Sequence, residues 1–332
     1  MSPSPKISVI VIAYKMSSQL ENTLLTLAPN FQRGVTADDY EVIVVENSSS
    51  DNMPAEKVAK LPSNFRYLLR EETAVSPVHA INLAFEMCTA PYICLMIDGA
   101  RMVSPGIIYN ALMAYGISEN AVVAVPGYHL GHEEQHLVEG DTNQAETEKE
   151  LLASVDWQND GYELFNISTF SGANSHGYLH PLMECNCLFG SARNYAAIGY
   201  ADTQFQLHGG GSINLHMYRS LGMLPGTALF VLPGEGSFHQ FHGGVTTSSY
   251  RERAEEIERH RVQLHSLWPE GFSSLRREST LLGRVPPQAK PFLIHSLQRA
   301  QKRNKRLVGQ GKDPWEDDTA LNGQPGHNRV RQ

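Results

Sequence analysis

This sequence of 332 residues has no long apolar runs, few cysteines and no excess of positive charge. No stretch reaches the roughly 18 consecutive apolar residues that a membrane helix needs, so we do not expect the chain to span a bilayer. A basic, apolar signal peptide is also missing, which predicts a cytoplasmic protein. The formal net charge of −8 argues against nucleic-acid binding, because that function requires a basic surface.

Only four cysteines occur, and two of them, Cys185 and Cys187, are separated by a single residue. That separation is too short for the usual zinc-binding spacing, so we expect small, buried, reduced residues. The motifs G-x-G-x-x-G and G-x-S-x-G are absent as well. Dinucleotide binding and serine-hydrolase chemistry therefore have no support in the sequence.

What the chain does contain, over its first hundred residues, is an alternation of short apolar runs with helical patterns. We expect strands at 7–14, 40–51, 65–72 and 93–97, with helices after Ser17 and over 77–87. The first two runs are apolar on both faces, as the strands of a parallel sheet are. This alternation predicts a parallel α/β sheet with right-handed crossovers.

Polar residues follow two of these strands directly. The second strand runs into Glu46 and a polar turn that ends at Asp51, and the strand at 93–97 ends at Asp98. Ligands of parallel α/β sheets bind beyond the carboxyl ends of the strands, so we expect Asp98 to face a ligand. Glu46 could contact a ligand or cap a turn, and a turn or helix cap is the better interpretation of Asp51.

The remainder of the chain is organised differently. An acidic stretch at 133–163 includes a helical pattern, and glycine, histidine and aromatic residues crowd 161–245, where we expect long loops. A charged helix is predicted over 249–268 and a basic amphipathic helix over 291–308, whereas 311–332 has the composition of a disordered tail. Three histidines close together in sequence are expected to be solvated: His129, His132 and His136.

Taken in order, these features resemble the family 2 glycosyltransferases, whose nucleotide-sugar-binding fold is of the GT-A type. The similar segments are SVIVIAY, VVENSSSD, HAINLAFEMCTAPYI, the strand ending at Asp98, IGYADTQF, INLHMYRSLG and FHQFHGG. The resemblance implies an α/β fold of GT-A type, with a mostly parallel central sheet flanked by helices and a C-terminal helical extension. It divides the chain into a nucleotide-sugar-binding half (1–110), an acceptor-side half (111–248), the helical extension (249–310) and the tail (311–332).

The resemblance also implies transfer of a sugar from a nucleotide-sugar donor, expected to be a UDP-sugar, to a saccharide or lipid-linked acceptor with inversion. Asp98 and His242, rather than His239, would hold a divalent cation. Oxygen ligands suit Mg²⁺ and Mn²⁺, and an imidazole shifts the preference toward Mn²⁺. Six residues would bind the nucleotide-sugar: Ala13, Tyr14, Glu46, Asn82, Asp98 and Arg101.

Two departures from the family pattern bear on catalysis. The family's Asp-x-Asp is reduced to Asp98-Gly99-Ala100, and Arg101 could replace part of the missing ligand's function by neutralising phosphate. The loop that carries the family's general base corresponds to QLHGGGSINLH, which has no acid. The base is therefore open among three candidates: Glu184, Asp202 and His208. The alternative function is a degenerate scaffold that binds nucleotide-sugar or glycan without turnover.

A run of basic residues lies within 299–306. It could be the solvated end of a helix, or it could dock on an anionic membrane surface, where a lipid-linked acceptor would be found. The second alternative predicts a cytoplasmic protein with a peripheral membrane contact.

Overall fold

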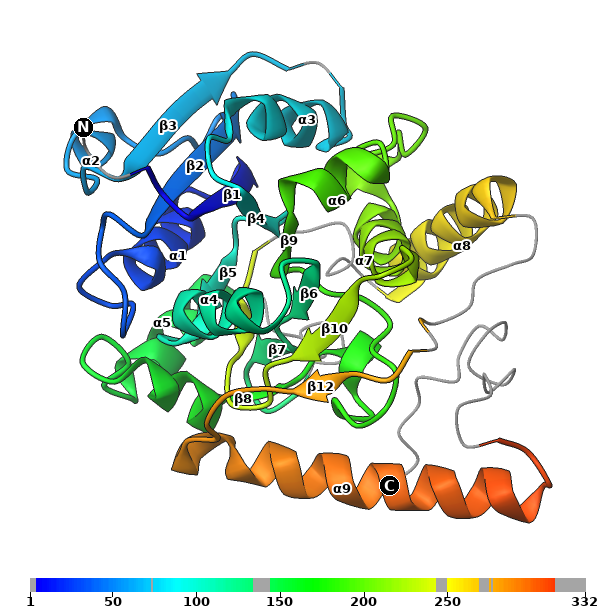
Figure 1. Ribbon diagram of the computed structural model, residues 1–332. Coiled ribbons are helices and arrows are strands. Elements are labelled where there is room, and N and C mark those ends of the chain that lie inside the picture. The colour runs from blue at the N-terminus through cyan, green and yellow to red at the C-terminus, as the bar shows by residue number, and fades with distance from the viewer. Residues whose placement is uncertain are drawn as a thin grey trace.

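Two sheets organise the chain, and helices pack around them (Figure 1). The computed structural model describes residues 4–72, 74–133, 144–242, 250–268, 275 and 277–313. Within that part, a sheet of eight strands has the order β12-β10-β6-β9-β4-β1-β2-β3, and a sheet of four strands has the order β5-β11-β7-β8.

The strands of the larger sheet are β1 (Ile7–Tyr14), β2 (Tyr40–Asn47), β3 (Phe65–Arg70), β4 (Tyr92–Met96), β6 (Ala121–Ala124), β9 (Leu188–Ser191), β10 (Ala228–Val231) and β12 (Thr280–Leu281). The strands of the smaller sheet are β5 (Arg101–Val103), β7 (Gly127–Leu130), β8 (Ser168–Phe170) and β11 (Ser237–His239).

The helices are α1 (Ser17–Leu27), α2 (Ala55–Val58), α3 (Val78–Met87), α4 (Ile107–Ile117), α5 (Gln144–Ala153), α6 (Ala192–Ala197), α7 (Ile213–Met223), α8 (Tyr250–Leu267) and α9 (Lys290–Gly309). Short 3₁₀ segments occur at η2 (Gly161–Ile167), η3 (Gly172–Asn174), η4 (His208–Gly210) and η5 (Pro287–Ala289). Among the described residues, no helix combines the length and the apolar character needed to cross a membrane.

The larger sheet is mostly parallel, as the sequence predicts. Strand β1 pairs in parallel with β2 and β4, β2 with β3, and β10 with both β6 and β12. The strand β9 runs antiparallel to its neighbours β4 and β6. Helices cover both faces, and the long helix α9 follows at the C-terminal side of the described chain, so the predicted α/β architecture with a C-terminal helical extension is confirmed.

Apolar side chains on both faces of the sheet explain this layering. One face packs against α1 and α4, through residues such as Leu20 and Ile108. The opposite face packs against α3, α6 and α7, through residues such as Ile81, Tyr195 and Leu221. Because β1 and β2 are buried between these two layers, both strands have apolar residues on both faces rather than a strict alternation with polar ones.

Several local expectations need correction. The polar turn after the second strand begins at Ser48, because β2 ends at Asn47, and the third strand ends at Arg70. The region 161–245 is not a set of long loops; it contributes strands to both sheets as well as α6 and α7. The predicted tail lies almost wholly outside the described residues, as does His136, and the division of the chain at 110, 248 and 310 stays a prediction.

The four cysteines are free thiols, as expected, and Cys94, Cys185 and Cys187 are buried. The sulfur atoms of Cys94 on β4 and Cys187, which directly precedes β9, lie 3.7 Å apart.

A buried carboxylate joins β1, β2 and β3 at the amino ends of these strands. Glu41 accepts hydrogen bonds from the Ser8 hydroxyl at 2.6 Å, from the Thr89 hydroxyl at 2.7 Å and from Arg66 at 3.2 Å. Burial by itself would raise the pKa of Glu41, but these hydrogen bonds outweigh that effect and hold it below its usual 4.5.

We predict that Glu41→Gln lowers the free energy of unfolding at pH 7 by about 1–3 kcal/mol, because charge-assisted hydrogen bonds are replaced by weaker ones. A lowered pKa in the folded state contributes stability that is present above the unfolded pKa and is lost as pH falls through the folded one. The difference between wild type and variant should therefore shrink in urea titrations run from pH 7 to below pH 4. The exposed Glu71→Gln is the control, and a difference that stays constant with pH would contradict this account.

Candidate active site

Asp98 lies at the carboxyl end of β4, in a sharp turn that leads into β5. The N–H of Ala100 donates to Asp98 Oδ1 over 3.0 Å and closes the turn. Glycine is required at position 99, because a β-carbon there would lie 2.8 Å from the carbonyl oxygen of Ile12 in β1. Asp98 is therefore held, half-buried, at the edge where ligands of such sheets bind.

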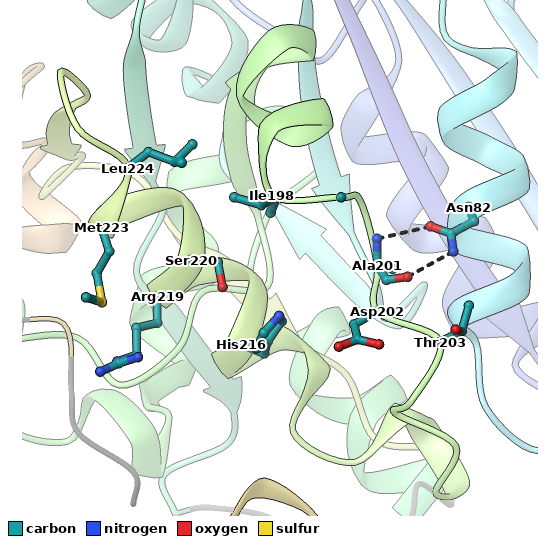
Figure 2. Close-up of a pocket in the computed structure, with 11 residues that line it drawn as sticks. Asn82, Ile198, Ala201, Asp202, Thr203, His216, Arg219, Ser220, Met223 and Leu224 are labelled. Carbon is teal, nitrogen blue, oxygen red and sulfur yellow. Dashed lines mark hydrogen bonds between the residues drawn. The ribbon is translucent and has the colours of Figure 1, made fainter. Parts of the chain in front are cut away.

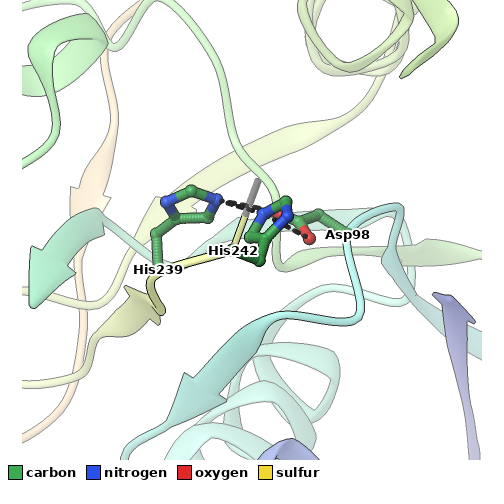
Figure 3. Close-up of side chains that lie close together, drawn as sticks. All are labelled: Asp98, His239 and His242. Carbon is green, nitrogen blue, oxygen red and sulfur yellow. Dashed lines mark hydrogen bonds and ion pairs between the residues drawn. The ribbon is translucent and has the colours of Figure 1, made fainter. Parts of the chain in front are cut away.

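Strand β11 brings two histidines to Asp98 from a distant part of the sequence. It pairs antiparallel with β5 and parallel with β7, so that His239 stands opposite both Arg101 and His129. His242 follows shortly after the strand ends and returns to the same point (Figure 3).

The side chains of Asp98, His239 and His242 form what we call the Asp98 cluster. His239 Nε2 lies 3.1 Å from Asp98 Oδ2 and 2.9 Å from His242 Nε2. His242 Nε2 lies 3.6 Å from Asp98 Oδ1. One carboxylate oxygen and two ring nitrogens thus converge on one small volume.

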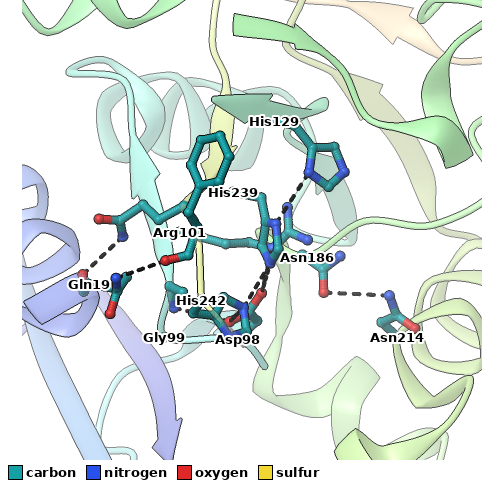
Figure 4. Close-up of polar contacts among 12 residues, drawn as sticks. Gln19, Asp98, Gly99, Arg101, His129, Asn186, Asn214, His239 and His242 are labelled. Atoms are coloured by element: carbon teal, nitrogen blue, oxygen red, sulfur yellow. Dashed lines mark hydrogen bonds and ion pairs between the residues drawn. The ribbon is translucent and has the colours of Figure 1, made fainter. Parts of the chain in front are cut away.

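The segment that carries His242 is fixed by side chains of helix α1. The Gln240 side-chain amide donates to the carbonyl of Gln19 at 2.9 Å and to the Thr23 hydroxyl at 3.0 Å. The Gln19 side chain donates in turn to the carbonyl of Phe241 at 2.8 Å (Figure 4). Because the Thr23 hydroxyl also donates to the carbonyl of Gly99 at 2.7 Å, one buried group links the Asp98 turn to the His242 segment.

The electrostatic environment sets the protonation states within the cluster. Burial would raise the pKa of Asp98, but the imidazoles of His242 and His239 outweigh it and hold the pKa well below its usual range. Burial lowers the pKa of His239 to about 4, against the opposing effect of Asp98. At neutral pH the cluster therefore presents an ionised carboxylate and a neutral imidazole at His239, the forms in which these groups bind metal ions.

The donor set fits a divalent cation. Bonds of about 2.1 Å to ligands at right angles would separate neighbouring ligand atoms by about 3 Å. The three potential ligand atoms of the Asp98 cluster all lie within 4.8 Å of one another, and two of the pairs are close to that separation. Two imidazoles and one carboxylate favour Mn²⁺ over Mg²⁺.

Two basic side chains border the cluster. Arg101 is buried on β5, and its Nε lies 3.3 Å from Asp98 Oδ2. His129 contacts the far side of His239, with 3.2 Å between the two Nδ1 atoms (Figure 4). The expectation that His129 is solvated is therefore wrong, whereas His132 is exposed as expected.

Of the three candidate bases, the structure places Glu184 near the cluster, where both Arg101 and Asp98 act on its charge. Its carboxylate accepts hydrogen bonds from Asn214 at 2.6 Å and from Asn186 at 3.3 Å, the two asparagines labelled beside the cluster in Figure 4. Burial raises the pKa of Glu184, against the opposing effects of Arg101 and of the Asn214 hydrogen bond.

The other two candidates lie elsewhere. Asp202 lines a separate pocket on the outer side of α7 (Figure 2), and its carboxylate accepts the N–H of Gln204 at 2.9 Å. His208 is exposed in η4. The structure therefore does not bring the three candidates together.

The remaining residues predicted to bind the nucleotide-sugar fall in two groups. Ala13 and Tyr14 end β1 at the same sheet edge, with Ala13 buried and Tyr14 exposed. Glu46 and Asn82 are engaged within the chain. The Glu46 carboxylate is fully buried and accepts from the Met53 N–H and the Tyr67 hydroxyl. Asn82 exchanges two hydrogen bonds with the backbone of Ala201.

The sequence favours His242 over His239 as a ligand and predicts a solvated His129. Both His239 and His129 meet the cluster only through the pairing of β11 with β5 and β7, and that register joins segments more than a hundred positions apart. The available signal is weak: each of these histidines directly follows an aromatic residue, Phe238 or Tyr128.

One family model and several solved structures are similar to this chain. Residues 8–125 match the family model "Glycosyl transferase family 2". The chain matches no curated protein. It is similar to the mannosyltransferase PcManGT from Pyrobaculum calidifontis, solved with GDP-Man and Mn²⁺, at 17% identity over 96% of this chain and 78% of that one, with a TM-score of 0.51. It is also similar to S. aureus TarS 1–349, solved with UDP-GlcNAc, at 13% identity over 89% of this chain and 72% of that one, with a TM-score of 0.49.

The geometry of the cluster predicts that His239 contributes as much to metal binding as His242 does. In titrations of Mn²⁺ into the full chain, followed by electron paramagnetic resonance, His239→Ala and His242→Ala should each weaken binding roughly tenfold or more, the size of effect seen even for groups that only orient a ligand. The exposed His132→Ala should bind Mn²⁺ as wild type does. Unchanged binding by His239→Ala would reduce the site to Asp98 and His242.

Proposed function

We propose that this chain is a glycosyltransferase, because residues 8–125 match the family model "Glycosyl transferase family 2". In this proposal it binds the diphosphate of its nucleotide-sugar donor at the Asp98 cluster. The observation that carries the proposal is the convergence of Asp98, His239 and His242 at the carboxyl end of β4. The donor that we propose to test first is a UDP-sugar, and the acceptor is a saccharide or a lipid-linked saccharide.

The residues around the cluster have complementary roles in this proposal. Asp98, His239 and His242 would hold the cation, which when bound stabilises the negative charge of the leaving diphosphate. Arg101 forms an ion pair with Asp98 and adds positive charge beside the phosphates. Thr23 and Gln240 hold the two ligand-bearing segments at a fixed separation.

Glu184 is the general base that we propose. An acceptor hydroxyl oxygen forms the new bond to the anomeric carbon as the bond from that carbon to the diphosphate breaks, which inverts the configuration. The hydroxyl proton passes to the Glu184 carboxylate, and the nucleoside diphosphate leaves. Hydrogen bonds from Asn214 and Asn186 occupy only part of the carboxylate's capacity to accept, so lone pairs remain for the acceptor.

The carboxylate of Glu184 also favours turnover over the alternative of a degenerate scaffold. The scaffold alternative rests on the alanine at position 100, where the family has a second acid, and on the acid-free loop at 206–216. If Glu184 is the base, this loop does not need an acid.

The proposal is tested first by calorimetric titration of UDP and of GDP, each with and without Mn²⁺. We expect one nucleotide to bind in the presence of Mn²⁺ and Asp98→Ala to weaken that binding about a hundredfold, because a cation ligand and its charge are both lost. The exposed Glu71→Gln is the matched control. If neither nucleotide binds wild type, the donor site is not at this cluster; if Asp98→Ala binds as wild type does, the diphosphate is held by Arg101 instead.

For the base, we expect Glu184→Gln to lower kcat by a factor of about 10² to 10⁴, because proton transfer in the transition state is lost while shape is kept. Nucleotide affinity should be unchanged. Asp202→Asn, a similar change at a competing candidate, should leave kcat close to that of wild type. Loss of kcat in Asp202→Asn but not in Glu184→Gln would exchange the two assignments.

The pH profile gives an independent check of the same assignment. Because burial raises the pKa of Glu184 above its usual 4.5, the base is protonated at acid pH and kcat/KM should rise with pH through a limb above 4.5. The residual kcat/KM of Glu184→Gln should not show this rise with pH.

A second part of the proposal concerns helix α9, which lies along one side of the molecule (Figure 1). Ile294, Leu297 and Val308 are exposed on one stripe of this helix, and Lys305 lies on the same stripe. Arg299 instead faces the protein, since it lies 2.5 Å from His176 Nδ1. We propose that the exposed stripe contacts an anionic membrane surface, because apolar side chains flanked by lysines are typical of interfacial helices.

We predict that the full chain binds vesicles of phosphatidylcholine with about 30% phosphatidylserine, a composition that gives a negative surface potential. Increasing the salt concentration should release the protein from these vesicles. Lys302→Gln with Lys305→Gln should weaken this binding about tenfold or more, since each lysine near such a surface contributes about 1 kcal/mol. Lys60→Gln with Lys149→Gln, an equal loss of exposed charge elsewhere, is the control. Equal binding by both double variants would remove α9 from the proposal.

A further inference from the structure

The structure contains a polar pocket that the chemistry above does not use. It has a volume of about 720 Å³ and lies between α7 and the loop that follows α6 (Figure 2). Asp202 and Thr203 line it from the loop, and His216, Arg219 and Ser220 line it from the helix. The two hydrogen bonds between Asn82 and Ala201 fix one wall.

This pocket is separated from the Asp98 cluster by helix α7 itself. Asn214 on α7 reaches Glu184, which lies beside the cluster. His216 is two residues further along, which places it about 200° around the helix axis, and Arg219 and Ser220 lie on that same far side. The pocket therefore opens on the outer face of α7, away from the proposed donor.

The donors on α7 are positioned by Trp268. The indole N–H of Trp268 donates to His216 Nδ1 at 3.1 Å, and the guanidinium of Arg219 lies 4.5 Å from the centre of the indole ring. Burial lowers the pKa of His216, so its ring is neutral near pH 7. Because Nδ1 accepts the indole N–H, the single ring proton is on Nε2, which can donate a hydrogen bond. One buried aromatic ring thus orients two hydrogen-bond donors before any ligand arrives.

The chemical character of the pocket selects a class of ligand. Asp202 accepts hydrogen bonds and would repel an anion, whereas Arg219 donates them and would repel a cation. Ile198, Met223 and Leu224 add apolar surface beside these polar groups. A neutral saccharide fits this combination, because each hydroxyl both donates and accepts and the ring presents an apolar C–H face.

An exposed aromatic residue lies next to the lining residues in the sequence. Tyr200 lies between two residues that line the pocket, has a φ of 62° and is 41% exposed. A residue other than glycine held in this left-handed region costs on the order of 1 kcal/mol, and such strain is concentrated at functional sites. In this conformation the centre of the Tyr200 ring lies 5.2 Å from the centre of the Phe85 ring.

We propose that this pocket is a second, non-catalytic saccharide site, which binds units of the acceptor or product chain remote from the hydroxyl that reacts; naming the saccharide as acceptor rests on the proposed function. Asp202 and Arg219 are then binding residues, and Trp268 is the residue that positions the donors.

The test is binding of neutral hexasaccharides of glucose, mannose, galactose and N-acetylglucosamine to the full chain, followed by saturation-transfer NMR and tryptophan fluorescence. At least one hexasaccharide should bind, and Arg219→Ala and Asp202→Asn should each weaken that binding roughly tenfold or more, because a charge-assisted hydrogen bond is lost. Thr203→Trp, at an exposed lining position, should block the pocket without disturbing the fold. Asp98→Ala should bind the sugar as wild type does, and so should Arg193→Ala, which removes an exposed arginine from the neighbouring helix α6.

The proposal is overturned if no hexasaccharide binds, or if binding survives Arg219→Ala, Asp202→Asn and Thr203→Trp. It is also overturned if Asp98→Ala abolishes the binding, because the sugar would then occupy the donor site. Titration of UDP and GDP into the same samples separates this question from the proposed function. Nucleotide binding without sugar binding overturns the pocket alone, and sugar binding without nucleotide binding overturns the donor site alone.

Discussion

The pairing of β11 between β5 and β7 is the constraint on which the candidate site depends. This register sets His239 opposite Arg101 on one side and His129 on the other. A slip of one residue would turn His239 to the other face of the small sheet and leave Asp98 without its nearest imidazole. The Thr23 hydroxyl reinforces the register from outside the sheet, because it bonds both to the Asp98 turn and to the segment that follows β11.

Pairing of the Asp98 carboxylate with basic side chains then offsets the free-energy cost of partly burying its charge. A half-buried carboxylate is costly unless it is paired, and Asp98 has a guanidinium on one side and two imidazoles on the other. The same partners that stabilise the carboxylate leave it ionised and aimed at a common point. Glu184 lies at the margin of this group and is less strongly stabilised, so that its burial raises its pKa whereas that of Asp98 is lowered. The pKa values of Asp98 and Glu184 are thereby shifted in opposite directions.

The fold could be predicted from the sequence to a large extent, because its signals are local. The apolar run at 7–14 coincides with β1, and the strand–helix alternation gives the mostly parallel sheet. Asp98 could be singled out for the same reason, since it directly follows a buried strand. The partners of Asp98 could not, because they are set by pairing between strands distant in sequence. Glu46 shows the converse: its place at a strand end suggested a ligand, but the structure occupies its carboxylate with Met53 and Tyr67.

Strand β11 also bears on how the protein reaches its active form. Its two sheet partners, β5 and β7, both precede it by more than a hundred residues, and closing such long loops has a large entropic cost that slows folding. During synthesis, β1 to β4 can pair as soon as they emerge, whereas the histidines of β11 arrive much later. The Asp98 cluster would thus be completed on strands β1 to β4 that have already paired, because two of its three members, His239 and His242, arrive with or after β11.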